Sequence, residues 1–242
     1  MNEVIKQLQE RKSMRVFEER EILAEDKALI LEAASMAPSA GNQQLYTILD
    51  ITDAELKKAL SESCDHQPFI ATAKMVLVIC ADCQKWYEAF LTSGCEPRKP
   101  GVGDLMLAMS DANIAAQNMV VAAQSLGIGS CYIGDIMENC EIHRKMLNLP
   151  EYVFPAAMLV FGYPTKQQIE RQKPERVAMK HIVHENGYRR MDGAELKEML
   201  EGKAVAQTYE AWMQAFCNRK FNSDFSKEMT RSVSEYLKSF EK

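Results

Sequence analysis

A long stretch without charged side chains, Ala112–Gly134, constrains the fold of this chain more than any other feature. It forms most of a helix that we expect to begin at Asp104 and to run for roughly 23 residues, on the order of 34 Å. The apolar residues of this helix do not keep to one stripe, and half of its polar residues are amides. A helix that is apolar nearly all round is buried on all sides.

The length of this stretch raises the question of a membrane span. Its amides and its Gly127-Ile128-Gly129 exit favour a buried helix instead. In a chain of 242 residues, one way to bury such a helix is against a symmetry mate. We therefore expect a homodimer with this helix at its centre. The alternative is a monomer whose other helices surround it.

The net charge and the cysteines limit which classes of partner and which cellular compartment we expect. There are 29 Lys and Arg against 34 Asp and Glu, a net charge of −5. This argues against nucleic acid as a partner, because phosphate neutralisation needs a basic face. Seven irregularly spaced cysteines, and no signal-peptide pattern in residues 1–25, predict a cytoplasmic protein without a membrane partner.

Composition does not change sharply along the chain, which predicts one domain, residues 1–190, with a helical C-terminal extension of the same domain, residues 191–242. Helices are expected at 2–9, at 26–37, after Asp53, and at 194–200, 204–217 and 225–240. Strands are expected at 45–52, 75–80, 155–162 and, at a sheet edge, 181–184. The segments 91–103 and 165–179 are expected to be loops.

Four short segments suit a ligand, and each also has a plain structural interpretation. Residues 11–15, Arg-Lys-Ser-Met-Arg, match phosphate oxygens, but a solvated basic turn would look the same. Residues 38–44 combine small residues with amides that suit the edge of a planar ring, or form a polar turn after a helix.

The other two segments lie further along the chain. Residues 127–135 are rich in glycine and offer backbone N–H groups, although a glycine-rich helix exit is also a routine cap. Residues 173–176, Lys-Pro-Glu-Arg, form a second basic cluster, for which a surface loop is the alternative.

Taken in this order, the four segments resemble the FMN-dependent nitroreductase family, and in particular its NADPH-preferring nitroreductase and flavin reductase branch. The similarity covers about residues 3–190 and is carried further by GIGSCYIGDIMEN, LPEYVFPAAMLVFGYP, IVHENGY and QPFIATAKMVLVICAD. It implies an α+β fold, a three-layer α/β/α sandwich with a mixed central sheet. It also implies an intertwined homodimer with FMN at the interface.

The same resemblance assigns roles to residues that match the family's motifs. Contacts to the FMN phosphate are implied for Arg11, Lys12, Ser13, Lys173 and Arg176. Ring contacts are implied for Arg15 near the N1/O2 edge, Gln67 at the pyrimidine edge, and the Tyr132, Ile133, Gly134 and Asp135 backbone beside N5. Contacts from the other subunit are implied for Pro38, Ser39, Ala40 and Asn42. A cation at N1/O2 stabilises the negative charge that reduction places on the flavin.

Two positions depart from the family pattern. Glu175 is inserted before Arg176, so either Arg176 still reaches the phosphate or Lys173 has that role alone. Asp135 stands where some relatives have glycine, and an acidic side chain there is expected to affect substrate preference.

The resemblance implies a ping-pong NAD(P)H oxidoreductase in which FMN carries the chemistry and no residue of the chain is a dedicated catalyst. Acceptors would be nitroaromatics, quinones or free flavin, and no metal is expected. Arg219 and Lys220 are candidates for the 2′-phosphate of NADPH, with solvated surface charge as their alternative. The rival hypotheses are a specialised FMN reductase or reductive dehalogenase on the same fold, and a non-catalytic FMN-binding protein.

Overall fold

The computed structural model describes residues 1–241, and these form two compact units. The first unit comprises Met1–Arg171 together with the C-terminal residues from Glu228 onward. The second unit is Gln172–Lys227.

A four-stranded sheet forms the centre of the first unit. Its strands are β1 (Tyr46–Asp50), β2 (Met75–Asp82), β3 (Gly129–Ile133) and β4 (Val153–Gly162), in the order β1-β2-β4-β3. Every residue of β2 and β4 is buried, as expected for strands covered on both faces. The expected strands at 45–52, 75–80 and 155–162 are thus confirmed, and β3 is the strand that periodicity did not identify.

The pairing within the sheet differs from the mixed sheet that the resemblance implied. The four strands pair antiparallel throughout. The parallel pairing in the described residues is an isolated bridge between Ser13 and Ser130, beside the outer edge of β3. One bridge is too short to count as a strand. Among the described residues, parallel pairing at this sheet is therefore limited to the contact between Ser13 and Ser130.

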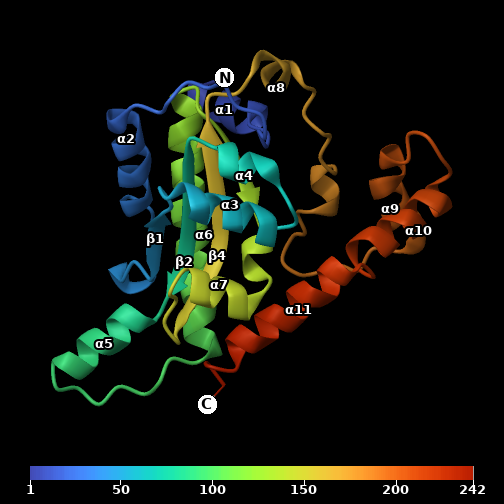
Figure 1. Cartoon of the computed structure of the whole chain (residues 1–242). Helices are drawn as coiled ribbons and strands as arrows, with labels where there is room; N and C mark the ends of the chain where they lie inside the picture. The colour runs from blue at the N-terminus through green and yellow to red at the C-terminus, as the bar shows by residue number, and fades with distance from the viewer. Residues whose placement is uncertain (242) are drawn as a thin grey trace. The chain divides into compact units, whose positions relative to one another are not determined.

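Helices cover both faces of the sheet, which gives the three layers of the expected α+β fold. Figure 1 shows α6 (Val102–Ser125) on one face and α3 (Ala54–Ser63), α4 (Pro68–Thr72) and α7 (Cys140–Met146) on the other. Helix α2 (Ala24–Ser35) packs against α6. The remaining helices of this unit are α1 (Glu3–Glu10), α5 (Gln84–Thr92), α8 (Lys166–Glu170) and the part of α11 (Asp224–Leu237) from Glu228 onward.

Helix α6 is the long helix that the sequence predicted, and it begins two residues earlier, at Val102. Asp104 caps it by accepting a 2.8 Å hydrogen bond from the Gly101 N–H. Its inward face is rich in alanine, which lets the helix lie close to the sheet. Its outer face leaves Met106 and Leu107 about half exposed, at 51% and 52%. Within one chain, therefore, the other helices do not surround α6, which was the alternative to burial against a second copy.

The second unit contains α9 (Gly193–Leu200) and α10 (Tyr209–Lys220). Asp192 and Thr208 cap these helices, so α10 starts later than the expected residue 204. The edge strand expected at 181–184 is wrong, because Met179–His181 form a 3-10 turn. None of the described helices has the length and apolar character needed to cross a lipid bilayer.

Candidate functional site

The first and third predicted segments meet at the outer edge of β3. The N–H of Met14 donates to the carbonyl of Ser130 at 2.9 Å, next to the Ser13–Ser130 bridge. A Cβ on Gly129 would lie 2.7 Å from Cγ of Met14, so this close approach requires glycine. The structure thus brings residues 11–15 and 129–135 into one site.

Arg11 supplies a guanidinium with two nitrogens that lack a hydrogen-bond partner among the described residues. Its Nε and Nη2 atoms are buried and make no hydrogen bond within the described residues. The group lies 5.8 Å from the centre of the Tyr132 ring. Leaving buried charged donors unpaired is costly, and a bidentate anion such as phosphate would satisfy them.

Lys12 is engaged differently from what the sequence suggested. Its ammonium group donates to the main-chain carbonyls of Ile169 and Arg171, at the end of α8. This holds the chain after α8 beside residues 11–13, and it leaves the main chain of Lys12 as the part available to a ligand.

Arg171 is a site residue that sequence reasoning missed. Its guanidinium donates to the carbonyl of Ser13 at 2.5 Å. The available signal was a basic residue two positions before Lys173, outside the recognised motif. With Arg11, Lys12 and Arg15 it gives this acidic chain a local basic site.

Arg15 and Gln67 approach one another through α4. The Arg15 guanidinium lies 5.9 Å from the centre of the Phe69 ring, two residues after Gln67. The Gln67 side chain donates to the carbonyl of Cys64 at 2.8 Å, and its side-chain oxygen has no hydrogen bond among the described residues. Both predicted ring contacts therefore lie on elements that meet.

The basic groups affect the side chains of β3. Burial raises the pKa of the Cys131 thiol, while Arg15 and Ser13 beside it act in the opposite direction. Burial raises the pKa of Tyr132 to about 12, against the effect of Arg11. Both side chains are neutral near pH 7, so the positive charge of the site is left for an anionic ligand.

The loop that contains Pro38, Ser39, Ala40 and Asn42 is organised by a residue that the sequence analysis did not select. The buried carboxylate of Asp111 on α6 accepts hydrogen bonds from the Ser39 hydroxyl at 2.6 Å and from the Ala40 N–H at 3.1 Å. It also accepts from the Leu45 N–H at 3.1 Å. The missed signal was an acidic residue within a helix that is otherwise almost free of charge.

This loop does not reach the Ser13 site in the same chain. Tyr46, just after the loop, lies in β1 at one edge of the sheet, and Ser130 lies in β3 at the other, three strand spacings or about 14 Å away. Along β4, the corresponding rows are at Phe154 and Phe161, seven residues or about 23 Å apart. One chain therefore cannot place both groups against the same ring.

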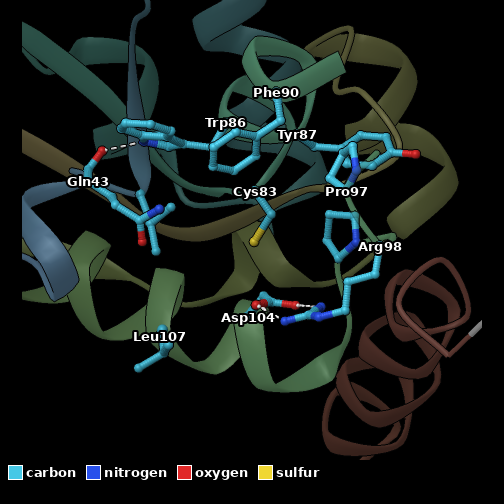
Figure 2. Close-up of a pocket in the computed structure, with 11 residues that line it drawn as sticks. Gln43, Cys83, Trp86, Tyr87, Phe90, Pro97, Arg98, Asp104 and Leu107 are labelled. Atoms are coloured by element: carbon cyan, nitrogen blue, oxygen red, sulfur yellow. Dashed lines mark hydrogen bonds and ion pairs between the residues drawn. The ribbon is translucent and has the colours of Figure 1, made fainter. Parts of the chain in front are cut away.

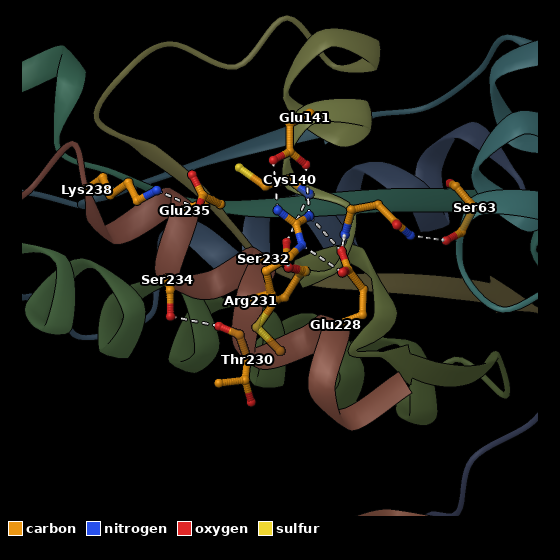
Figure 3. A network of polar contacts seen from close by, with 12 residues as sticks. Ser63, Cys140, Glu141, Glu228, Thr230, Arg231, Ser232, Ser234, Glu235 and Lys238 are labelled. Carbon is orange, nitrogen blue, oxygen red and sulfur yellow. Dashed lines mark hydrogen bonds and ion pairs between the residues drawn. The ribbon is translucent and has the colours of Figure 1, made fainter. Parts of the chain in front are cut away.

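The segment that follows Tyr132–Asp135 is fixed by α11. Figure 3 shows Arg231 between Glu141 and Glu228, with donor–acceptor distances of 2.8–2.9 Å. Ser232 donates to the carbonyl of Met137 at 2.7 Å and accepts from the N–H of Cys140 at 2.9 Å. These contacts hold residues 137–141 against the core.

Glu138 lies within this fixed segment and is 6% exposed. Its Oε1 has no hydrogen-bond partner among the described residues. Burial, with the nearby carboxylates of Asp135, Asp65 and Glu228, raises the pKa of Glu138 to about 7. The adjacent His143 is buried, and its two ring nitrogens contact the carbonyl of Ile136 and the hydroxyl of Ser63.

Lys173, Arg176, Arg219 and Lys220 belong to the second unit. Within that unit, the Arg219 guanidinium lies 5.4 Å from the Phe216 ring centre, and the Lys220 ammonium lies 6.0 Å from that of Phe225. Their predicted contacts to the phosphate and to NADPH stay predictions.

Comparison with known proteins identifies the family. The model of the nitroreductase family matches residues 8–163, well over half of the chain. The chain belongs to the nitroreductase family. The sequence-based recognition is thereby confirmed, and the α+β fold agrees with that of its solved relatives.

Three relatives illustrate the similarity. "FMN reductase [NAD(P)H]" of Bacillus subtilis is 30% identical over 245 residues, covering 98% of this chain and 91% of that protein. "Oxygen-insensitive NADPH nitroreductase" of Salmonella typhimurium is 32% identical over 193 residues, covering 79% and 77%. The solved structure of NfrA2 from B. megaterium is 28% identical, covers 100% of both chains and superposes with a TM-score of 0.85.

Proposed function

We propose that this nitroreductase-family chain binds FMN at the Ser13 site and uses it to transfer electrons from NADPH to a small acceptor. The observation that carries the proposal is Arg11, two residues before Ser13, whose guanidinium nitrogens Nε and Nη2 are buried and have no hydrogen-bond partner among the described residues. The names of the relatives, which are FMN reductases and nitroreductases, support the same cofactor and reaction class.

The phosphate of FMN is held by Arg11, by the Ser13 hydroxyl and by the main chain of Lys12. Arg171 fixes the carbonyl of Ser13 and so orients this loop. For Lys173 and Arg176, contacts to this phosphate are what the family resemblance implies, and we keep them as part of the proposal. Bidentate arginine contacts give such a site geometric selectivity as well as affinity.

The ring of FMN is oriented by Arg15 at its N1/O2 edge, by Gln67 at its pyrimidine edge, and by the Tyr132–Asp135 backbone beside N5. Bound there, FMN would supply the redox chemistry, the uptake of a hydride from NADPH and its transfer to the acceptor. The chain's own residues bind and orient the ring, and the positive charge of Arg15 favours its reduced, anionic form. None of them has to transfer a proton as a dedicated acid or base.

The site is completed by a second copy of the chain. Pro38, Ser39, Ala40 and Asn42 are too far from the Ser13 site of their own chain, so we assign them to the flavin of the partner. The exposed apolar residues of α6, which include Met106, Leu107 and Ile114, are the surface that the partner covers. A homodimer thus accounts both for the separated loop and for the apolar helix.

The setting we propose is cytoplasmic, because all seven cysteines are free thiols. The acceptors we propose are nitroaromatics, quinones or free flavin, bound in turn at the pocket that NADPH leaves. The 2′-phosphate of NADPH is assigned to Arg219 and Lys220. If Arg219→Ala leaves the KM for NADPH unchanged, this assignment is wrong.

Steady-state kinetics test the reaction class. Initial rates are measured with NADPH varied at several fixed concentrations of a nitroaromatic, a quinone or free FMN. Parallel double-reciprocal lines are expected for each acceptor that is used.

Turnover with free FMN alone would support the specialised FMN reductase. Release of halide from a halogenated aromatic would favour the dehalogenase. Flavin binding without turnover of any acceptor would contradict the proposal and leave a flavin-binding protein.

A further inference from the structure

A second pocket lies at the other end of the sheet from the Ser13 site. It has a volume of about 290 Å³, is open to solvent, and is lined by α5, the 93–101 segment and the start of α6. Figure 2 shows three aromatic side chains along its upper wall, Trp86, Tyr87 and Phe90, with Pro97 beside them. Gln43 and Leu107 form the opposite end.

The aromatic rings of this wall are held in place with their polar atoms already satisfied. The indole N–H of Trp86 donates to the carbonyl of Gln43 at 2.7 Å. The Trp86 and Phe90 ring centres lie 5.7 Å apart at 44°, and Tyr87 packs edge-on against Tyr152 at 5.5 Å. What this wall offers a ligand is therefore ring surface.

The charges at the pocket neutralise one another. The guanidinium of Arg98 donates to both oxygens of Asp104, at 2.6 and 2.9 Å. This pair lowers the pKa of Asp104, and both groups are ionised near neutral pH. Burial raises the pKa of the Cys83 thiol to about 12, so this sulfur is a neutral wall atom.

One polar group remains for a ligand. The side-chain amide of Gln43 makes no hydrogen bond among the described residues, since the bond to Trp86 uses its main chain. An amide offers both a donor and an acceptor. The lining is thus apolar and aromatic, with one uncommitted polar side chain, which is the pattern of small-molecule sites.

We propose that this pocket binds an uncharged, planar aromatic molecule of one or two rings that carries a single hydroxyl or carbonyl group. The ring stacks on the α5 wall, where aromatic pairs prefer centre separations of about 4.5–7 Å. The polar group pairs with the Gln43 amide. The volume, near the lower end of the range for ligand sites, limits the molecule to this size.

Within one chain this site is separate from the Ser13 site, because it is lined by Gln43 and Leu45, next to the start of β1, while Leu107 at its edge belongs to the α6 face that we assign to the partner subunit. It nevertheless adjoins the Pro38–Asn42 loop through Gln43. Occupancy of the pocket is therefore expected to alter the flavin environment of the partner subunit. This coupling rests on the proposed function. Binding of the ligand to the pocket does not rest on it.

The test uses 19F NMR of FMN-saturated protein labelled with 5-fluorotryptophan. The chain has two tryptophans, Trp86 and Trp212, and Trp212→Phe assigns the two resonances. During titration with 2-naphthol, the Trp86 resonance is expected to shift saturably while that of Trp212 stays in place. Phe90→Ala should raise the dissociation constant about tenfold.

A matched control is Phe225→Ala, since Phe225 and Phe90 are 37% and 39% exposed. A second variant, Cys83→Met, narrows the pocket and should also weaken binding. A Trp86 resonance that does not shift saturably overturns the proposal. So does a shift that survives unchanged in Phe90→Ala and Cys83→Met, because the probe would then be bound at the flavin. The titration is then repeated without FMN. A saturable Trp86 shift in the absence of FMN shows that this pocket binds the probe whether or not the flavin site exists.

Discussion

The carboxylate of Asp111, in the middle of α6, accepts a 2.6 Å hydrogen bond from the hydroxyl of Ser39. The same carboxylate binds the N–H groups of Ala40 and Leu45. Gly41, Asn42 and Gln44 in this loop have positive φ angles of 56°, 57° and 48°, which few residues adopt without support. Asp111 therefore fixes the loop that we assign to the flavin of the partner subunit.

The substitution Asp111→Asn tests this role. An amide at this position keeps the shape of the carboxylate but offers one acceptor oxygen to three donors, so the loop should lose order and about 1–3 kcal/mol of stability. FMN affinity should fall as well, as measured by fluorescence titration. Asp53→Asn is the matched control, since asparagine replaces aspartate at a helix N-cap with little loss. Equal effects of the two substitutions on FMN affinity would contradict the role of Asp111.

Arg11 should have opposite effects on stability and on binding. Its buried guanidinium nitrogens lack partners within the described chain, so Arg11→Ala should leave the FMN-free protein at least as stable as the wild type. The same substitution should weaken FMN binding at least about tenfold, the value of one or two charge-assisted hydrogen bonds.

Thermal unfolding with and without FMN checks both effects. Arg189→Ala, which removes an arginine paired with Glu195 in the second unit, should leave FMN affinity unchanged. If Arg11→Ala destabilises the FMN-free protein and leaves FMN affinity intact, Arg11 is a structural residue and the phosphate site is elsewhere.

Glu138 should make stability depend on pH. Its pKa is about 7 in the folded protein and about 4.5 in the unfolded chain, so the folded state binds the proton more tightly. Its contribution is fully present below about pH 4.5 and is lost as pH rises through 7. Glu138→Gln should therefore be more stable than the wild type at pH 8, by up to about 3 kcal/mol, and equal to it at pH 4.

Denaturant titrations at the two pH values measure this difference. Glu141→Gln is the control with the opposite sign. The Arg231 guanidinium lowers the pKa of Glu141 to about 2, so its carboxylate stabilises the fold at neutral pH and Glu141→Gln should destabilise it. A Glu138→Gln variant that matches the wild type at pH 8 would show that folding does not raise the pKa of Glu138.

The sequence predicted the elements whose signals are local. Asp53 caps α3 as expected, with its side chain accepting from the N–H of Leu56. The buried strands β2 and β4 were evident from continuous apolar runs. By contrast, β3 was not identified as a strand, because it is short and follows directly on a glycine-rich helix end, and its pairing with Ser13 depends on residues far away in sequence.

The candidate site was predictable where family motifs carry it, and less so where contacts are made by tertiary structure. Residues 11–15 lie beside β3, where Ser13 pairs with Ser130 and the Arg11 guanidinium lies over the Tyr132 ring. Arg171 and Asp111 were missed because each acts through hydrogen bonds to distant main-chain groups, which leave no local pattern. Helix α6 is apolar nearly all round, but the other helices of the same chain leave its outer face exposed.

The dimer can be tested at that face. Met106→Glu places a charge on the exposed surface of α6 and should yield a 27.4 kDa species in sedimentation, with weakened FMN binding. Ile142→Glu is its matched control. Met106 and Ile142 are both 51% exposed, but Ile142 lies on α7, on the opposite face of the sheet. A wild-type protein that sediments only as the 27.4 kDa species would contradict the homodimer.

The most direct test of the central claim is the visible absorption spectrum of the purified protein under anaerobic conditions, before and after addition of NADPH. The account predicts a bound flavin band that bleaches promptly and returns when a quinone is added. No flavin band after incubation with FMN would contradict the cofactor site. A bound flavin that neither NADPH nor NADH reduces would contradict the reductase function.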